Sequence, residues 1–519
     1  MDGKKLIASL ALILLSTNHV NAQGCFTPNS TISYLTENTT LCPGHYMNKY
    51  IDLTADDITL DCDGAILDVN FSTSGAALDV SSDGTTVKNC IIFNFGKGYQ
   101  ISTTDTNNIN DYVINNTFIN TSYSSNTGGI ISAVLNDNFY ILNNTFIGNK
   151  NCIQVYAGDN IIIQGNNFTE NLFNVISQSG VNTTYLTITE NYFTDNLEWS
   201  NDMIGLGGQY IHHSSIIDNV FINNNGSAIS ITGSGSSIKS NITISENIIR
   251  NVSHLYSPAI QFTTDLDNSV VSDNVIDVVD GSCIWDGGSS INVSYINNTV
   301  SNCNGAGIYL DSSSGSLVEN NTLLNNSYGL QLYSYSNLAT VRGNTIRDSN
   351  TSGINAYSCN NCSFEENNVI YTIRDGFYIG ASSNDTVVFD NLFCYSDLEE
   401  LFGQDIDNHG GAGTTGWNNT CDTYYSWNDE GTTGCTYPCA TTTTSTSTTS
   451  TSTTSSSTTS STTSSSTTSS TTSTSTTSTT SSSTTSTSPT TSTTTSLCTQ
   501  PNCTEFLGGW NLISLALTP

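Results

Sequence analysis

Two aspartates at similar positions in neighbouring repeats are candidates for acid–base chemistry. Asp286 ends the segment CIWD and Asp311 ends the segment GIYLD, about one repeat later. If these segments stack as neighbouring strands, the two carboxyl groups lie ~5 Å apart, which is the separation of a retaining glycosidase pair. Like charges that close raise the pKa of one carboxyl group and so supply an acid. Asp286 and Asp311 are therefore the catalytic candidates, and a cation site or a loop is the alternative role for such a pair.

Aromatic and amide side chains recur on the same strand-like segment of five repeats. Strand alternation places one apolar residue of each segment inward: Ile284, Ile308, Leu330, Ile354 and Phe377. The expected outward neighbours are Trp285, Tyr309, Gln331, Asn355 and Tyr378, and a second outward row is expected from Asp286, Asp311, Tyr333 and Tyr357. Rings and amides at strand spacing can stack on sugars and hydrogen-bond to them. We predict a carbohydrate-binding surface from these aromatic and amide residues, and ordinary exposed sheet residues are the alternative.

Other motifs with chemical potential have simpler interpretations. His212 and His213 point to opposite faces of a strand, so they cannot share a metal from that strand. Cys359-x-x-Cys362 has redox or metal spacing, but in an exported chain a structural disulfide is the favoured interpretation. The segment 265–269 has Asp, Asp and Ser at alternate positions but lacks the glycine and distal glutamate of an EF-hand. We predict no metal site and no cofactor, with Ca²⁺ as the alternative.

The charge balance restricts the partners. The chain has 11 Lys+Arg against 44 Asp+Glu, a formal net charge of −33. This acidic excess argues against nucleic acid, and against acidic polysaccharides unless a cation bridges them. We therefore expect a carbohydrate or cell-surface partner and no nucleic acid. We also expect no membrane span in this chain.

A repeated phrase, Asn followed by any residue and then a large apolar residue, indicates the fold. Anchored on one asparagine per copy, it recurs every 23 to 28 residues. Within a copy the hydrophobic period is two, and the Asn, Ser, Thr and Gly content disfavours helix. Three short strands per repeat make one coil of a parallel β-helix, so we predict an all-β, right-handed parallel β-helix solenoid of about 13–15 coils, ~60–70 Å long. A leucine-rich repeat has a similar period, but its leucine consensus is missing.

Stacking gives the repeated asparagine a structural role. The same position in successive coils lies one strand spacing above its predecessor, so buried amides can donate to one neighbour and accept from the other. The predicted ladder is Asn89, Asn116, Asn144, Asn167, Asn191, Asn219, Asn247, Asn274, Asn298, Asn321, Asn344, Asn368 and Asn391.

Composition divides the chain into segments. Residues 1–22 have the charged start, apolar run and small-residue end of a secretory signal peptide. We predict an N-terminal cap at 23–57, the β-helix at 58–395, a cysteine-rich C-terminal cap at 396–440 and a disordered Ser/Thr linker or stalk at 441–496. Residues 497–519 are expected to begin a second, incomplete domain or to form a docking tail.

The cysteines agree with an exported, oxidised protein. Fifteen cysteines imply disulfides, and the twenty Asn-x-Ser/Thr sequons are compatible with a glycoprotein. Cys25 and Cys42 are a plausible clasp of the N-terminal cap. Cys62 and Cys90 fall at the same point of adjacent coils, so they form either a disulfide or two buried thiols.

The segment TADDITLDCDGAILD and the N-N-T-[FLV] coils ending in G-I-x-L resemble the right-handed parallel β-helix repeat proteins over about residues 45–395. These include the NosD-type and the carbohydrate-binding and sugar-hydrolase β-helix groups. The resemblance implies the fold and a link to carbohydrates, whereas one scaffold carries many activities. The G-H-G and R-x-K signatures of polygalacturonase-type relatives are missing from the sequence. We expect a secreted or surface-displayed, non-catalytic glycan-binding or adhesive module, with a glycoside hydrolase or lyase as the alternative.

Overall fold

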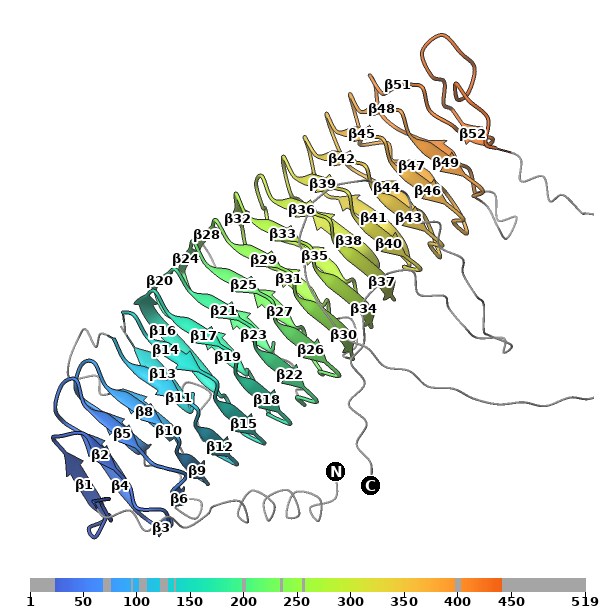
Figure 1. The fold of residues 1–519 in the computed structure, drawn as a ribbon. Coiled ribbons are helices and arrows are strands. Elements are labelled where there is room, and N and C mark those ends of the chain that lie inside the picture. The colour runs from blue at the N-terminus through green and yellow to red at the C-terminus, as the bar shows by residue number, and fades with distance from the viewer. Residues whose placement is uncertain are drawn as a thin grey trace, which may run out of the picture. The chain divides into compact units, whose positions relative to one another are not determined.

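A computed structural model describes residues 24–68, 76–94, 97–101, 110–121, 129–134, 137–197, 202–233, 237–253, 257–396 and 403–440 (Figure 1). The chain divides into two units, residues 1–443 and 444–519, and all described residues belong to the first. Every regular element among them is a β-strand, and the strands pair in parallel with the equivalent strand of the next coil. The predicted all-β parallel β-helix is therefore confirmed.

Within the described residues, three long sheets form the sides of the solenoid. Sheet 1 has 16 strands: β2(Thr39–Thr40), β5(Thr59–Asp61), β8(Thr86–Lys88), β11(Tyr112–Ile114), β14(Tyr140–Leu142), β17(Ile162–Gln164), β21(Thr187–Thr189), β25(Ser215–Ile217), β29(Thr243–Ser245), β33(Val270–Ser272), β36(Ser294–Ile296), β39(Leu317–Glu319), β42(Thr340–Arg342), β45(Ser363–Glu365), β48(Val387–Phe389) and β51(Thr415–Trp417). Sheet 2 has 15: β3(His45–Met47), β6(Ile66–Asp68), β9(Ile91–Phe93), β12(Thr117–Ile119), β15(Thr145–Ile147), β18(Asn167–Thr169), β22(Tyr192–Thr194), β26(Val220–Ile222), β30(Ile248–Val252), β34(Val275–Val279), β37(Thr299–Cys303), β40(Thr322–Leu324), β43(Thr345–Arg347), β46(Asn368–Ile370) and β49(Leu392–Cys394).

Sheet 3 carries the predicted binding surface, and 17 of its strands lie in the described part of the chain. They are β13(Ile131–Val134), β16(Ile153–Asp159), β19(Ile176–Gln178), β20(Asn182–Thr184), β23(Ile204–Leu206), β24(Tyr210–His212), β27(Ile229–Ile231), β28(Ile238–Ser240), β31(Ile260–Phe262), β32(Leu266–Asp267), β35(Ile284–Asp286), β38(Ala306–Asp311), β41(Tyr328–Tyr333), β44(Ile354–Ala356), β47(Phe377–Ile379), β50(Ile406–Asn408) and β52(Tyr424–Tyr425). A four-stranded sheet, β1(Ile32–Leu35), β4(Tyr50–Leu53), β7(Ala76–Val80) and β10(Lys97–Ile101), occupies the N-terminal coils.

The core consists of the inward residue of each strand. In sheet 2 the central residues of successive strands are fully buried phenylalanines whose rings stack at centroid distances of 4.5–4.9 Å: Phe118, Phe146, Phe168, Phe193 and Phe221. Short strands with one inward residue flanked by outward ones explain the period of two in the sequence. Each coil buries its apolar surface against its neighbours, so the repeat itself builds the core.

An asparagine ladder runs along the corner between sheets 1 and 2. Each buried amide donates from Nδ2 to Oδ1 of the rung in the next coil, at 2.9–3.1 Å from Asn116 to Asn419. The rungs are Asn116, Asn144, Asn166, Asn191, Asn219, Asn247, Asn274, Asn298, Asn321, Asn344, Asn367, Asn391 and Asn419. The other Nδ2 proton goes to a backbone carbonyl of the preceding coil, as from Asn321 to Tyr295 at 2.8 Å. The stack thus satisfies amides that would be costly to bury alone.

Three of the predicted ladder positions are wrong by one residue. Asn89 is a corner residue with φ of 59°, and the backbone N–H of Cys90 takes the rung's place by donating to Asn116. Asn167 and Asn368 follow the true rungs, Asn166 and Asn367. The rung precedes the inward apolar residue by two positions, whereas the residue between them starts a strand and faces outward.

A second ladder was missed by sequence reasoning. It lies five residues after the first ladder in five consecutive coils and begins where Thr121 donates to Asn149. From there each amide donates to the next rung at 2.9–3.1 Å, in the order Asn149, Asn171, Asn196 and Asn224. The signal was present in the sequence as a second asparagine in NNTFIGN, NNFTEN and ENYFTDN. This ladder satisfies buried hydrogen-bonding groups at the corner where the chain leaves sheet 2.

The rung and its sequence neighbour make a matched pair for testing the ladder. Replacing Asn367 with leucine removes acceptors for Asn344 and the donor to Asn391, and should destabilise the fold by roughly 1–3 kcal/mol. Replacing Asn368, whose Oδ1 accepts no hydrogen bond from any described residue, should cost much less. Urea unfolding of the two variants checks this, and equal losses would contradict the assignment of the rung.

The sheets of the solenoid continue into both of the predicted caps. Strands β1 to β4 pair with later strands although they lie in the expected N-terminal cap, and β50 to β52 continue the sheets into the expected C-terminal cap. These coils lack the asparagine phrase by which the repeat was counted. The signal segment 1–22, the linker 441–496 and the segment 497–519 lie outside the described residues, so these boundaries stay predictions.

Six disulfides fasten the described coils: Cys25–Cys42, Cys62–Cys90, Cys283–Cys303, Cys359–Cys362, Cys394–Cys439 and Cys421–Cys435. The pair at Cys62 and Cys90, left open by the spacing, is thus a disulfide. The last two bonds hold the C-terminal end of the solenoid. Six disulfides indicate an oxidising environment outside the cytoplasm.

Candidate functional site

The first predicted row forms a continuous column on the outer face of sheet 3. Register pairs Trp285 with Tyr309, Tyr309 with Gln331, Gln331 with Asn355, and Asn355 with Tyr378. Their inward neighbours Ile284, Ile308, Leu330, Ile354 and Phe377 are all fully buried. The five outward side chains are half-buried, so each presents part of a ring or an amide to solvent.

The second predicted row is wrong at Asp286. Asp286 pairs in register with Leu310, not with Asp311, and its side chain is buried inside the solenoid. The physical reason is strand alternation: Asp286 is one residue from the outward Trp285, whereas Asp311 is two residues from the outward Tyr309. Asp311 instead pairs with Tyr333. Asp286 and Asp311 therefore face opposite sides of sheet 3, and the proposed catalytic pair does not exist.

Inside the core, Asp286 has its own set of partners. It accepts hydrogen bonds from Ser313 at 2.6 Å, Tyr295 at 2.7 Å and Ser290 at 2.8 Å. Burial is the largest influence on its carboxyl group and, despite these donors, raises its pKa to about 6. Burial and the neighbouring Asp286 raise the pKa of Tyr295, so the phenol stays protonated as a donor. The arrangement is a structural network with no access to a substrate.

Tyrosine rings continue the outer surface beside the first row. Tyr333 and Tyr357 stack with ring centroids 4.9 Å apart, and Tyr309 meets Tyr333 edge-on at 6.3 Å. Burial and then the charge of Asp311 raise the pKa of Tyr309 to about 12. The predicted residues of the first row and the tyrosines of the second thus lie together on one face of sheet 3.

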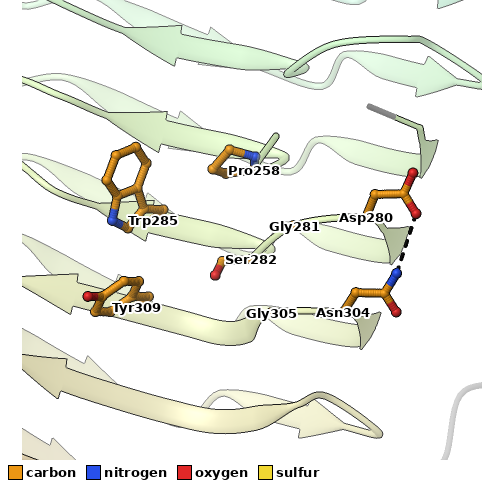
Figure 2. Close-up of a pocket in the computed structure, with 8 residues that line it drawn as sticks. All are labelled: Pro258, Asp280, Gly281, Ser282, Trp285, Asn304, Gly305 and Tyr309. Carbon is orange, nitrogen blue, oxygen red and sulfur yellow. Dashed lines mark hydrogen bonds between the residues drawn. The ribbon is translucent and has the colours of Figure 1, made fainter. Parts of the chain in front are cut away.

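A pocket of about 430 Å³ opens beside Trp285 and Tyr309 (Figure 2). The two rings form one side, and Asp280 and Asn304 the opposite side, where Asn304 Nδ2 donates to Asp280 Oδ1 at 3.4 Å. Gly281, Ser282 and Gly305 lie between the two sides, and Pro258 completes the lining. The pocket spans three coils, at the loops that lead into β31, β35 and β38.

Glycine is required between the two sides of the pocket. A Cβ atom at Gly305 would lie 2.6 Å from Ser282 Oγ and 2.7 Å from the Ser282 backbone nitrogen, so any other residue would have to shift this loop. Trp285 Nε1 has no hydrogen-bond partner among the described residues, although the atom is buried. Because this atom is buried, it is not exposed to a ligand in the pocket, and the indole contributes its ring to the lining.

Asp202 is a site residue that sequence reasoning missed. It accepts a hydrogen bond from Gln261 Nε2 at 3.1 Å, and the same amide donates to Ser230 at 2.9 Å. Gln261 pairs in register with Trp285, so this carboxyl group lies near the aromatic row. Burial raises the pKa of Asp202 to about 6. It precedes β23 in a loop outside the repeat, and nothing local in the sequence marks it.

The remaining candidates show no metal centre. His212 Nδ1 lies 2.7 Å from Ser240 Oγ, while the ring of His213 stacks on Tyr185 at 5.4 Å. Asp265 accepts from the backbone of Ser289 at 3.2 Å. No group of three or more His, Cys, Asp or Glu side chains that could hold a metal occurs within the described part of the chain. The same part has no helix long and apolar enough to cross a membrane.

Several solved structures are similar to this chain at low sequence identity. An alginate lyase in complex with G6 is 15% identical, with 67% of this chain and 81% of that chain covered at a TM-score of 0.42. A tailspike protein of an E. coli bacteriophage in complex with a pentasaccharide is 12% identical, with 77% and 70% covered at 0.34. A periplasmic alginate epimerase is 10% identical, with 75% and 78% covered at 0.28.

A search of curated proteins by sequence found no match. Residues 128–295, 175–346 and 280–393 each match the family described as "Right handed beta helix region". Together these ranges run without a gap from 128 to 393, which is half of the 519 residues. With the parallel coils seen over the same segment, the chain belongs to the right-handed β-helix family.

Proposed function

We propose that this chain is a secreted or surface-displayed glycan-binding module. It holds its ligand on the outer face of sheet 3. The observation that carries the proposal is the pocket beside Trp285 and Tyr309, continued by a column of amides and rings at one-coil spacing. Sugar rings present apolar C–H faces and hydroxyl groups, which match aromatic faces and amides. The expected partner is a carbohydrate on a cell surface or in a matrix.

The aromatic pair provides the direct test. Replacing Trp285 or Tyr309 with alanine should weaken retention on a glycan array by about tenfold, because each substitution removes a stacking surface worth ~1–2 kcal/mol. Trp417 is a matched control: it is an exposed tryptophan, 37% accessible, stacked on Phe389 in sheet 1. Alanine at Trp417 should leave binding unchanged. Circular dichroism should match the parent in all three variants.

Two outcomes would overturn this proposal. One is that the parent protein retains no glycan on the array. The other is that the Trp417 variant loses as much binding as the Trp285 variant, because a loss independent of position would reflect general damage to the solenoid.

A polysaccharide-active enzyme is the second candidate, and Asp202 is the observation that favours it. A carboxyl group with a pKa of about 6 beside a sugar-binding surface has the property required of a general acid. Reducing-end release or unsaturated-product absorbance on a panel of neutral and acidic polysaccharides separates the two candidates. Activity that disappears in an Asp202→Asn variant would make the protein an enzyme, and a parent without activity on the panel supports the binding module.

A further inference from the structure

Among the described residues, the pocket and its flanking rows carry negative charge and no side-chain cation. Asp280 lines the pocket and Asp311 lies beside Tyr309. Asp202 accepts a hydrogen bond from Gln261, which is in register with Trp285 of the first row. None of the described residues of the pocket or the two rows is Lys, Arg or His. Among the described residues, Arg250 lies on sheet 2 in register with Asp277, Lys239 is buried, and Arg374 and His409 lie next to the far end of the row at Tyr378. The end that holds the pocket is therefore anionic.

This charge distribution discriminates among glycans of similar shape. A uronate chain would place its carboxylates against Asp280 and Asp311 with no cation to pair with them, and like charges at short range cost binding energy. An ammonium group has two favourable interactions available here. A carboxylate attracts it by charge, and the face of Trp or Tyr attracts it through the ring quadrupole. A net charge of −33 over the whole chain adds long-range attraction for a cationic polymer.

The pocket offers these two interactions on opposite sides. Trp285 and Tyr309 present rings on one side, and the carboxylate of Asp280 stands on the other (Figure 2). Asp280 is exposed and accepts one long hydrogen bond, 3.4 Å from Asn304, so its oxygens have capacity for a further donor. A glycan chain can place one sugar ring against the aromatic side and the amino group of a neighbouring unit against this carboxylate.

We propose that the pocket selects sugars with a free amino group, as in a polymer of 2-amino-2-deoxyhexose, with Asp280 as the ammonium acceptor. This inference rests on the proposed glycan-binding function and names the class of glycan. The amine pairs with Asp280, and the ring stacks on Trp285 or Tyr309. The uncharged N-acetyl form loses the ion pair, and a uronate is repelled.

Three β-1,4-linked hexamers that differ at carbon 2 test the inference. They are the glucosamine hexamer, the N-acetylglucosamine hexamer and cellohexaose, with a mannuronate hexamer as the anionic probe. Calorimetry under mildly acidic conditions should give at least tenfold tighter binding for the glucosamine hexamer than for cellohexaose, and the least for the mannuronate hexamer. Added salt should reduce the difference, because the ion pair is partly exposed.

Variants assign the preference to the pocket. Asp280→Asn keeps the shape of the side chain and removes its charge, so it should abolish the preference for the glucosamine hexamer over cellohexaose. Asp390→Asn makes the same change of net charge at an exposed corner between β48 and β49, where φ is 57°, and should keep the preference. An equal loss in both variants would show that the preference reflects total charge and would overturn the assignment to Asp280.

The outcomes separate this inference from the proposed function. If cellohexaose and the glucosamine hexamer bind equally and Trp285→Ala abolishes both, the amino-sugar inference fails and the glycan-binding function stands. If none of the four hexamers binds, both fail for this pocket.

Discussion

Replacing Asp429 with alanine is expected to destabilise the C-terminal coils by about 3–5 kcal/mol. Asp429 ends the asparagine ladder: it accepts from the backbone N–H of Asn419 at 2.9 Å and from Asn419 Nδ2 at 2.7 Å. It also accepts from Trp427 Nε1 at 3.1 Å and from the backbone and hydroxyl of Thr436, both at 2.8 Å. The side chain is only 1% exposed. Alanine would leave five donors without this acceptor, and each unsatisfied buried group costs ~1–3 kcal/mol.

The direction of the ladder makes the charge of Asp429 important. Each rung donates its backbone N–H and one Nδ2 proton toward the C-terminal end, as from Asn321 to Asn344, so the last rung presents two donors to the final coil. A carboxylate at that end is stabilised in the same way as one at a helix N-terminus. Asparagine at this position retains one acceptor and loses the charge, so its cost should be intermediate.

Local unfolding is the measurement that suits a solenoid, because its coils can melt from an end. Hydrogen exchange in β48 to β51 should accelerate strongly in the Asp429→Ala variant, while exchange in β21 and β25 near the middle changes little. Glu430→Ala is the neighbouring control, since this side chain is exposed, and surface substitutions of this kind shift stability by about 0.5 kcal/mol or less. Unchanged exchange in the last coils would refute the role of Asp429 as ladder cap.

The second large effect is expected from Asp286 and depends on pH. Its pKa is raised from 3.8 to about 6 in the folded state, chiefly by burial. The folded protein therefore binds a proton more tightly than the unfolded chain does. The contribution is fully present below about pH 4 and is lost as the pH rises through about 6. A shift of about two pKa units corresponds to about 3 kcal/mol.

An Asp286→Asn variant isolates this contribution, because the amide is neutral at every pH. The free energy of unfolding of the variant relative to the parent should rise by about 3 kcal/mol between about pH 4 and pH 7.5. Asp390→Asn, at an exposed position, should show no such difference between the two pH values. Urea titrations at both pH values measure it. If the difference in unfolding free energy between the Asp286→Asn variant and the parent does not change with pH, the pKa of Asp286 is not raised in the folded protein.

The repeat by itself determined the fold class. Alternation with period two and one asparagine phrase every 23 to 28 residues are local patterns, and each coil packs only on its neighbours. Stacking equivalent positions was therefore enough to predict the outward row from Trp285 to Tyr378 and most rungs of the ladder. Tyr333 and Tyr357 could be added to the same face for the same reason.

Only the tertiary structure decided the features that depend on a single residue of register or on contacts between coils. A one-residue offset within the strand sends Asp286 into the core and leaves Asp311 outside, because the side-chain period is two. The same offset separates Asn166 and Asn367 from their neighbours. Asp202 reaches Gln261 across two coils, and the pocket forms between loops 24 residues apart, at Asp280 and Asn304. Such contacts are set by how the loops of successive coils stack, which no local pattern of the sequence encodes.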